Sequence, residues 1–544
     1  MISEAKQAYK TKVVGLFKTN KSAYAWKGLK TLTGMLKSKK VPALLNSHGV
    51  ADELNKFYAR FDDKDFSKEH QDLLEKFQCT SEKLPEDLVK LHLARVKTNK
   101  APGPDKIQVT VIKRCRESLF KIIYHIDNES LETGVFPDIW KMGAIVPVPK
   151  KDLPKEMNDF RPVTLTSILA KCCERAVRHL LMQHVEQWLD PLQFAYLKNR
   201  STDDATLYLT HKITKHLDIK SSNTARALLI DYSSAFNLMQ PHILINKLNN
   251  MDVPTFLQRW ILHFLIKRPQ YVQTKLERSS TLTLSTGAPQ GCALSANLFV
   301  LYTNDLQSDS EETCIIKYAD DTVVVGLISD DDDSKYFECI SKVERWCDTN
   351  HLCLNINKTK EMYWDFRKNP SQKTTVKLKN MDVEAVQSYK YLGLYIDSGF
   401  SFAHHIKTTC KKVNKRMYFV RSMVKLNVDP NIIALFFNST IPPVLNYSML
   451  TFYKMIPQYA RYELDKPRKI CQRLIGKSYD LIDNLKEYNR RAKHQADKVI
   501  KDSAHPLHKE YVKLPSGRRY RVVKARTERY RLSFVPVSIR LLNS

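Results

Sequence analysis

The clearest pattern in the chain is an apolar run that two adjacent acids interrupt. Residues 315–325 read Ile-Ile-Lys-Tyr-Ala-Asp-Asp-Thr-Val-Val-Val, so strand-like segments flank Asp320 and Asp321 on both sides. Aspartate is depleted in strands, and neighbouring carboxylates repel one another. The pattern therefore predicts a hairpin with acids at its tip. Two interpretations of these acids stay open, a solvated acidic turn and a turn that holds divalent metal ions.

A second apolar segment, residues 226–230, ends at Asp231 and predicts a buried strand. An acid at the carboxyl end of a buried strand has little structural use, and open α/β sheets place their chemistry at strand ends. We therefore expect Asp231 to be functional. If this strand lies beside the acidic hairpin in one sheet, the three carboxylates converge.

Further periodic segments predict elements on both sides of these acids. Residues 402–490 turn helical and basic, with five Lys and Arg clustered within 407–416. The four consecutive aspartates at 330–333 lie between a strand and a helix and are interpreted as a cap and loop. Helices are expected over 48–66, 85–99, 109–124, 167–189, 336–350 and 430–440 and from Ser201, strands over 140–148, 351–357 and 391–396, a hairpin over 270–285 and a linker over 67–84.

The segment Gly287-Ala288-Pro289-Gln290-Gly291 is a glycine-bounded turn before an apolar helix. Glycine allows a close approach between the backbone and a ligand. The start of a helix offers free amide donors to phosphate or sugar groups. We therefore expect a ligand at this turn and free amides at the start of the helix.

Composition narrows the partners. The chain has 544 residues, a size that favours two to four domains. With 87 Lys and Arg against 58 Asp and Glu, its net charge is +29, which favours a polyanion partner. No apolar run approaches the length of a membrane span, and the first residues do not resemble a signal peptide. The 11 scattered cysteines favour free thiols in a reducing compartment over a zinc site. These features predict a protein of the nucleus and cytoplasm that is neither secreted nor bound to membranes.

The two ends of the chain are basic. Residues 1–40 carry ten lysines and one acid, and they are expected either to lie on nucleic acid or to form a solvated helical face. Residues 505–544 interleave arginines with Tyr520, Tyr530 and Phe534. Arginine for phosphates and aromatic rings for bases would grip a single strand. The alternative is a solvated coil.

A cluster of three acids suits one chemistry in particular. Two Mg²⁺ ions about 3.5–4 Å apart activate a hydroxyl nucleophile and stabilise the leaving group in phosphoryl transfer. Mg²⁺ prefers oxygen ligands, so aspartates suit it better than cysteine or histidine. We therefore expect Asp231, Asp320 and Asp321 to hold two Mg²⁺ or Mn²⁺ ions.

Seven segments, in this order, resemble motifs of the reverse transcriptases of non-LTR (LINE-type) retrotransposons. The resemblance covers nearly the whole chain from about residue 90 onward. The segments are Ala101-Pro102-Gly103-Pro104-Asp105, 160–165 (Phe-Arg-Pro-Val-Thr-Leu), 227–236 with Asp231, 287–291, Tyr318-Ala319-Asp320-Asp321, Asn357-Lys358-Thr359-Lys360 and Tyr391-Leu392-Gly393.

The resemblance implies an α+β fold with the shape of a right hand. It implies an RNA-directed DNA polymerase that extends the 3′-hydroxyl of a DNA primer on an RNA template with dNTPs. Such proteins normally carry an endonuclease domain ahead of the polymerase, and here we expect only a basic extension there. The expected parts are a basic helical extension and linker (1–84), fingers (85–225), a palm with an antiparallel sheet (226–400), a helical thumb (401–490) and a basic C-terminal region (491–544).

The resemblance also assigns roles to single residues. Asp231, Asp320 and Asp321 would be catalytic and hold the metals, with the backbone carbonyl of Tyr232 as a further ligand. Phe236 would lie under the sugar of the nucleotide, where a flat ring excludes a 2′-hydroxyl. The other implied nucleotide contacts are Arg161, Gln290 and Lys358, with Lys358 or Lys360 as a proton donor to pyrophosphate, and the implied contacts with template and primer are Gly287, Pro289, Gly291, Tyr391 and Gly393.

Two other functions remain open. The first is a degenerate retrotransposon remnant that binds nucleic acid without polymerising, because Ala296 stands where the family usually has proline. The second is an RNA-templated RNA polymerase, against which Phe236 argues.

Overall fold

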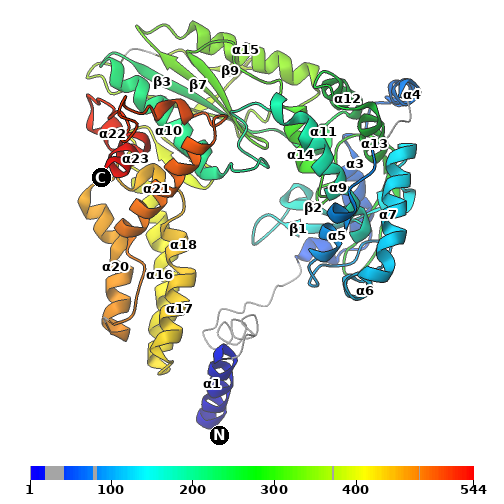
Figure 1. The fold of residues 1–544 in the computed structure, drawn as a ribbon, viewed down its shortest axis with the longest axis horizontal. Helices are drawn as coiled ribbons and strands as arrows, with labels where there is room; N and C mark the ends of the chain where they lie inside the picture. The colour runs from blue at the N-terminus through cyan, green and yellow to red at the C-terminus, as the bar shows by residue number, and fades with distance from the viewer. Residues whose placement is uncertain (1, 19–41, 78–81, 371–372, 477) are drawn as a thin grey trace.

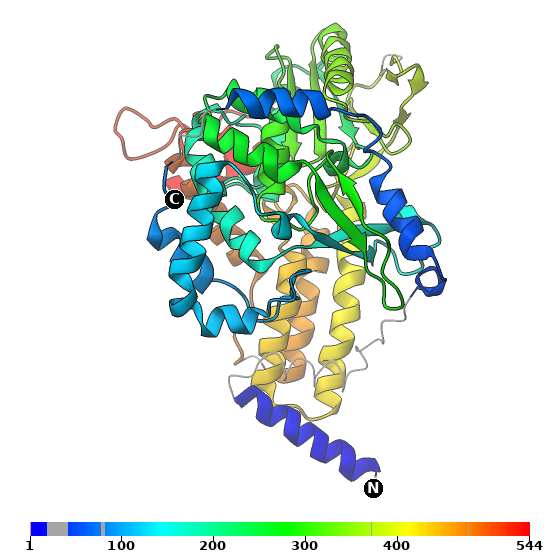
Figure 2. The ribbon, with the colours of Figure 1, turned by 90° about the vertical axis from the view of Figure 1, so that its right-hand side faces the viewer.

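The computed structural model describes residues 2–18, 42–77, 82–370, 373–476 and 478–544. The chain forms an arch, in which a sheet at the top carries one helical lobe at each end (Figure 1). The lobe on the right contains α3 to α9 together with α12 to α14, the lobe on the left contains the C-terminal helices, and α1 lies apart below them. Turned by 90°, the two lobes overlap in the view, and the long C-terminal helices extend away from the sheet toward α1 (Figure 2).

The central sheet has five strands in the order β11-β8-β3-β7-β6. Strand β3 lies in the middle and pairs antiparallel with both of its neighbours. All seven of its residues are buried, which matches its apolar sequence. The strands are β3 (Thr224–Ile230), β6 (Thr313–Tyr318), β7 (Asp321–Ile328), β8 (Lys360–Trp364) and β11 (Glu384–Ala385).

Alternate residues of β3 enter two separate hydrophobic cores, because successive strand side chains point to opposite faces. Leu228 and Ile230 join the core that contains Tyr336 and Ile340 of α15 (Ser334–Thr349). Ala227 and Leu229 join the core that contains Leu207 and Ile213 of α10 (Thr202–Ile219). Helix α15 lies above the sheet and α10 below it in Figure 1.

The first lobe is built on a smaller sheet of order β2-β1-β4-β5, in which β1 and β4 are parallel and the other pairs antiparallel. Val50, Leu54 and Tyr58 of α3 (Val50–Ala59) pack on it against Ile145 and Val272. The remaining elements of this lobe are β1 (Gly143–Pro149), β2 (Phe160–Leu165), β4 (Arg268–Val272), β5 (Leu282–Leu284), α5 (Glu86–Ala94), α6 (Val109–Arg114), α7 (Arg116–Thr133), α9 (Ile168–Val185), α12 (Pro241–Asn249), α13 (Thr255–Leu265) and α14 (Ser295–Tyr302).

The second lobe begins after a short hairpin and is helical. Helices α16, α17 and α20 pack against one another, and Val413, Met417 and Val420 of α16 are fully buried in their interface. Helix α17 begins and ends where its sequence pattern predicts, at Pro430 and Thr440. The elements are β12 (Ser388–Tyr391), β13 (Leu394–Asp397), α16 (Ala403–Lys425), α17 (Pro430–Thr440), α18 (Pro442–Leu445), α19 (Met449–Phe452), α20 (Gln458–Ile475) and α21 (Asn484–Lys501).

The C-terminal region docks on α10 and is not a free arm. The Asp218 carboxylate of α10 accepts hydrogen bonds from the backbone N–H groups of Arg526 and Thr527, at 3.0 and 2.7 Å. Tyr530 of α22 (Glu528–Arg531) and Phe534 of α23 (Phe534–Asn543) are each 3% exposed. The suggestion that these two rings are free to stack on bases is therefore wrong, because both contribute to the protein core.

Several predicted boundaries are also wrong. Trp140 and Lys141 end a helical turn, α8, so β1 begins only at Gly143. The carbonyl of Asn355 accepts hydrogen bonds from two amides three and four residues later, so 351–357 turns instead of extending. Residues 391–396 form a hairpin around Leu392-Gly393, and half of the predicted linker is helix α4.

The remaining short elements complete the description. No helix within the described residues is both long and apolar enough to cross a membrane. The short elements are α1 (Ile2–Lys18), η1 (Ala43–Asn46), α4 (Ser67–Lys76), α8 (Asp138–Lys141), η2 (Met157–Asp159), η3 (Glu186–Trp188), α11 (Ala235–Leu238), β9 (Lys377–Leu378), β10 (Met381–Asp382) and η4 (His508–Glu510). The basic arm predicted over 1–40 lies partly outside the described residues.

Arg226 stabilises the end of β3 that lies away from Asp231. It is 3% exposed and forms an ion pair of 2.8 Å with Glu361 of β8, which is completely buried. The second carboxylate partner of Arg226 is Asp333, the last aspartate of the run at 330–333, so this run is not entirely solvated.

We predict that Arg226→Gln lowers the free energy of unfolding by about 3–5 kcal/mol, because it leaves the Glu361 carboxylate buried without a cation. The double variant Arg226→Gln/Glu361→Gln should recover part of the loss. Urea unfolding followed by circular dichroism measures both. A single variant as stable as the native chain would show that this ion pair does not hold the sheet.

Candidate active site

The three predicted acids lie at one end of the central sheet. Ile230, the last residue of β3, pairs with Thr322 of β7, so Asp231 follows β3 where Asp321 begins β7. Asp320 occupies the tight turn between β6 and β7, after Ala319 with a φ of 58°. The predicted convergence of the two strands in one sheet is therefore present.

The acids interact electrostatically. Loss of hydration, followed by the negative charges of Asp320 and Asp231, raises the pKa of Asp321 to about 6. The pKa of Asp320 is raised by loss of hydration and by Asp231, while the guanidinium of Arg161 opposes the shift. Each carboxylate thus lies within the field of the other two.

The three carboxylates are not packed closely enough to form a preformed metal site. Among the described residues, no three or more His, Cys, Asp and Glu side chains are gathered closely enough to hold a metal ion. Like charges that no cation bridges repel one another. Lys358 supplies a positive charge instead, with its Nζ 3.6 Å from Oδ2 of Asp231. The ligand set itself is all oxygen, which suits Mg²⁺.

A rim of cations from the first lobe and from the segment before β8 lies near these acids. Burial and the nearby charges of Lys358, Arg161 and Arg60 lower the pKa of Lys150. Four cations are therefore gathered at the sheet edge. Lys150 is absent from the predicted site residues, although its place at the end of a strand next to Pro149 was visible in the sequence.

Tyr232 and Phe236 follow β3 directly. An antiparallel bridge joins Tyr232 to Leu354. Its two hydrogen bonds run from the Asn355 N–H to the Asp231 carbonyl and from the Ser233 N–H to the Cys353 carbonyl, so neither uses the Tyr232 carbonyl. The ring of Phe236 stacks on Phe299 of α14, with centroids 4.7 Å apart and planes at 29°. Phe236 is therefore held in a fixed position near the acids.

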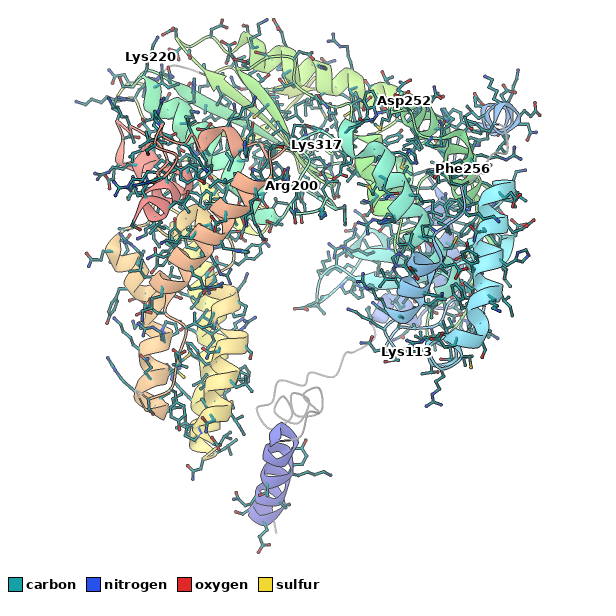
Figure 3. The ribbon with its side chains drawn as sticks, in the orientation of Figure 1. Lys113, Arg200, Lys220, Asp252, Phe256 and Lys317 are labelled. Carbon is teal, nitrogen blue, oxygen red and sulfur yellow. The ribbon has the colours of Figure 1, made fainter. Side chains whose placement is uncertain are left out.

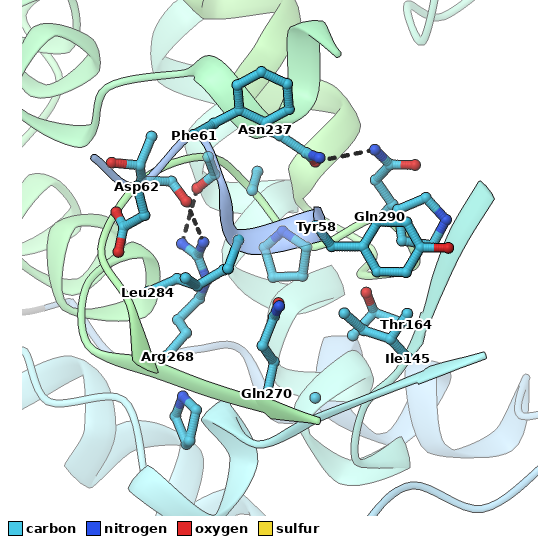
Figure 4. A pocket seen from close by; sticks show the side chains of 18 of the residues that line it. Tyr58, Phe61, Asp62, Ile145, Thr164, Asn237, Arg268, Gln270, Leu284 and Gln290 are labelled. Carbon is cyan, nitrogen blue, oxygen red and sulfur yellow. Dashed lines mark hydrogen bonds between the residues drawn. The ribbon is translucent and has the colours of Figure 1, made fainter. Parts of the chain in front are cut away.

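The glycine-bounded turn packs against the segment around Phe236. The N–H of Gly287 donates to the Met239 carbonyl at 2.7 Å, and the N–H of Ala288 donates to the Phe236 carbonyl at 2.8 Å. The side chain of Gln290 donates to Asn237 at 3.1 Å (Figure 4). A Cβ on Gly287 would lie 2.8 Å from the Asn237 backbone, so glycine is required for this close approach.

A buried arginine fixes the other side of this turn. Arg268 donates to the carbonyls of Thr286 and Gly287 at 2.6 and 2.8 Å (Figure 4). Its burial lowers its pKa to about 10. Sequence reasoning missed this residue, because nothing in the local pattern of Arg268 shows that it bonds to a turn almost twenty residues later. Pro289 is half-buried between these contacts.

The amides just ahead of the following helix are occupied within the protein, although free amides were expected where this helix starts. Helix α14 begins at Ser295, and the N–H groups of Ala293 and Leu294 donate to the carboxylate of Glu174. Glu174 is fully buried on α9. A Cβ on Gly291 would overlap the carbonyl oxygen of Thr164, so the turn also rests directly on β2.

Gln193 connects the acidic turn to the preceding segment. Its Oε1 accepts hydrogen bonds from the N–H groups of Ala195, at 3.0 Å, and Ala319, at 3.3 Å. A parallel bridge also joins Gln193 to Lys317. The residue before Asp320 is therefore held by a side chain that sequence reasoning did not assign to the site.

The hairpin β12–β13 borders the acids on the other side. The negative charges of Asp321 and Asp231 contribute to the raised pKa of Tyr389, after its burial. Tyr391 is 2% exposed, so its side chain packs in the core. Gly393 has a φ of 89°, and Tyr447 of the second lobe donates its hydroxyl hydrogen to the adjacent Leu392 carbonyl. Any contact of Tyr391 and Gly393 with nucleic acid would therefore involve the backbone of this turn.

Residues 148–396 match the family described as reverse transcriptase (RNA-dependent DNA polymerase). The matched range contains Arg161, the three acids, the glycine-bounded turn and the β12–β13 hairpin. Residues 148–396 therefore form a reverse transcriptase domain that is similar to those of non-LTR retrotransposons. The predicted resemblance is thereby confirmed.

Curated relatives of this reverse transcriptase come from mobile elements. The RNA-directed DNA polymerase from mobile element jockey of Drosophila melanogaster is 24% identical over 384 residues, which cover 67% of this chain and 41% of the relative. The probable RNA-directed DNA polymerase from transposon BS of the same organism is 25% identical over 336 residues, 59% of this chain and 36% of the relative. The Pol polyprotein from type-1 retrotransposable element R1 of Bradysia coprophila is 22% identical over 344 residues, 61% and 34% of the two chains. The chain thus spans less than half the length of these relatives.

We predict that Asp321→Asn stabilises the reverse transcriptase at pH 8 in the absence of divalent metal. The folded pKa of about 6 lies above the ordinary value of 3.8, so the folded state binds this proton more tightly and loses stability as pH rises from 4 to 6. The full cost persists above pH 6 and disappears below pH 4.

Melting temperatures at pH 4 and pH 8 test this prediction. Asp321→Asn should melt higher than the native chain at pH 8 and at about the same temperature at pH 4. The exposed Asp72 of α4 gives a matched control, Asp72→Asn, which should change neither value. An Asp321→Asn chain that melts no higher than the native one at pH 8 would show that the three acids do not repel one another.

Proposed function

We propose that this chain is the polymerase part of a retrotransposon reverse transcriptase and extends the 3′-hydroxyl of a DNA primer on an RNA template with dNTPs. The observation that carries the proposal is the meeting of Asp231, Asp320 and Asp321 at one sheet edge, opposite Arg161, inside a reverse transcriptase domain. The relatives named above as RNA-directed DNA polymerases support it.

Asp231, Asp320 and Asp321, with the Tyr232 carbonyl, would hold two Mg²⁺ or Mn²⁺ ions. When bound, such ions supply the charge that activates the primer hydroxyl and stabilises the pyrophosphate leaving group. The raised pKa of Asp321 means that this carboxylate ionises fully only above about pH 6, so metal affinity should rise with pH through that range.

The cationic rim suits the triphosphate of the nucleotide. Arg161 offers a planar pair of donors that matches two phosphate oxygens. Lys150 and Lys358 lie in the same rim, and Lys358 is 64% exposed at its side chain, so it can leave Asp231 to donate a proton to pyrophosphate. Lys360 is less suited to this role, because its ammonium group bonds to Glu384 at 2.8 Å.

The arch supports an assignment of fingers, palm and thumb to the first lobe, the central sheet and the second lobe (Figure 1). We propose the divisions 85–225, 226–400 and 401–490, with 1–84 ahead of them and 491–544 behind. Two strands depart from these divisions, because β4 and β5 lie within 226–400 but belong to the sheet of the first lobe. The fingers sheet would therefore be completed by a segment of the palm range.

We propose that the protein acts in the nucleus and cytoplasm. The ten cysteines of the described residues are all free thiols, and most are buried. Free thiols of this kind are compatible with a reducing compartment.

We predict that Asp320→Asn and Asp321→Asn each abolish primer extension, with losses of at least about a thousandfold, because two bound cations contribute several kcal/mol to the transition state. Extension of a labelled DNA primer on an RNA template with Mg²⁺ and dNTPs measures the rate, and chelation of Mg²⁺ should stop it. Asp332→Asn, a change of the same type in the acidic loop, is the matched control and should stay active. An Asp320→Asn chain with the native rate would disprove the proposal.

We predict that Phe236→Val weakens the choice of dNTP over rNTP by about 10–200-fold, the usual effect of reshaping a tight pocket by a few atoms. Phe236→Tyr keeps the flat ring and should keep the selectivity. Single-nucleotide incorporation with dGTP and GTP on the same template measures both. Equal selectivity in Phe236→Val and the native chain would mean that another residue excludes the 2′-hydroxyl.

A further inference from the structure

A large groove runs along α9 on the inner side of the first lobe and includes Gln193 and Gly291 at the border of the site described above. Its volume is about 1510 Å³, and its wall comes from α5, α9, the turn at 189–200 and residues 501–504. Nine Lys and Arg line it against three acids. The cations are Arg95, Lys97, Lys100, Lys171, Arg175, Arg178, Lys198, Arg200 and Lys501, and the acids are Glu186, Asp190 and Asp502.

Two of the three acids are already neutralised by other partners. Asp190 forms an ion pair of 2.8 Å with Lys317, which is completely buried behind the groove. Asp502 forms an ion pair with Arg200. The other cations therefore leave a strong positive excess along the groove.

His92 shows the effect of this excess. Its burial and then the charges of Arg175, Arg95, His179 and Arg178 lower its pKa to about 4. The cations around His92 therefore add to one another's field, which a bound anion would offset.

The groove also contains buried polar nitrogens without a partner among the described residues. They are Nε of Arg178, Nε2 of His92 and Nε2 of Gln193. Gln193 lines the groove and is 1% exposed, and its Oε1 accepts from Ala319, while its amide nitrogen has no partner among the described residues. Buried donors without acceptors cost free energy, so these atoms point to a ligand that supplies oxygens.

The groove reaches the acids, because Gln193 in its wall accepts a hydrogen bond from Ala319, the residue before Asp320. The C-terminal part of the chain also lines the groove, where Arg200 donates to the Ala504 carbonyl at 3.0 Å and pairs with Asp502. Figure 3 labels Arg200 on the inner side of the arch, below the central sheet, near Lys317.

Apolar surface is interleaved with these cations. Tyr196 is 50% exposed, Leu91 39% and Val163 37%, and all three lie in the groove wall. A single strand presents both phosphates and unpaired base faces to such a surface, whereas a duplex presents mainly phosphates. The combination therefore favours a single strand.

We propose that this groove binds the unpaired template strand before it reaches the acids, with the α9 cations on its phosphates and Tyr196 against a base. The proposal rests on the function proposed above. Residues 501–504 then form part of the wall of the template path, which gives the C-terminal region a place in nucleic-acid binding through its backbone and Lys501.

The test is equilibrium binding by the full-length chain, without nucleotides, so that no catalysis is needed. The probes are a labelled blunt primer–template hybrid and the same hybrid with a ten-nucleotide 5′ template extension. The extension should raise affinity in the native chain. In Arg175→Gln/Arg178→Gln, the ratio of the two affinities should be at least five-fold smaller than in the native chain. The affinity for the blunt hybrid should not change. Affinity should also fall less steeply with salt. The negative slope of log affinity against log salt should become shallower by about 0.7 for each phosphate that the variant no longer neutralises.

Two further variants make the test decisive. Arg95→Gln/Lys97→Gln changes exposed groove side chains just after α5, so it should lose the same gain without a risk to folding. Lys113→Gln/Lys121→Gln removes two exposed cations of α6 and α7 outside the groove and should keep the whole gain. If both groove variants keep the gain, the groove does not bind template.

The same experiment separates this proposal from the proposed polymerase activity. The native chain could fail to add nucleotides and still bind the hybrid with the 5′ overhang more tightly, in a way that depends on Arg95 and Arg175. That result would support the groove proposal and contradict the polymerase proposal. If the native chain adds nucleotides but the groove variants bind both hybrids like the native chain, the polymerase proposal stands and the groove proposal is wrong.

Discussion

The constraint on which this structure depends is that three aspartates must lie side by side although they repel one another. No ion pair among the described residues neutralises Asp320 or Asp321, and the raised pKa of Asp321 shows the cost. The backbone imposes the arrangement. Strand β3 is hydrogen-bonded on both edges and buried on both faces, and its register with β7 brings Asp231 beside Asp321. Two hydrophobic cores and the Arg226–Glu361 ion pair stabilise this sheet, so the fold tolerates charges that a cation would later neutralise.

Helix α9 connects the acids to the rest of the first lobe. Its buried Glu174 carboxylate binds the amides that precede α14, which sets the position of the glycine-bounded turn. Arg178, one turn further along the same helix, and Arg175 line the cationic groove. Gln193 plays a similar double part, because one atom of its amide holds Ala319 and the other borders the groove. A strand bound in the groove would therefore contact the same elements that position Asp320.

The sequence was sufficient for the elements whose signal is local. The apolar runs around Asp320 and Asp231 predicted the strands and their convergence, and Pro430 to Thr440 predicted a helix to the residue. Sequence reasoning failed where a contact with a residue far away in the chain determines the environment of a side chain or an amide. Tyr530 and Phe534 resemble free aromatic residues of a basic tail until α10 is known to cover them. The amides before α14 look free until Glu174, more than a hundred residues earlier, is placed against them. Arg268 and Gln193 could not be assigned, because single polar residues carry no periodic signal.

Three acids of this basic chain form contacts within the protein that involve the C-terminal region. Asp204 contacts His505, Asp218 accepts a hydrogen bond from Thr527, and Glu510 pairs with Lys215. These contacts attach residues 491–544 to α10. Asp204 is 2% exposed and Asp218 is 9% exposed. Both carboxylates would lose these partners if the C-terminal region were detached. Because Arg200 lies just before α10 and pairs with Asp502, the same attachment fixes the part of the groove wall around Asp502. The acidic contacts of this region therefore serve one arrangement, in which they hold exposed cations beside the groove.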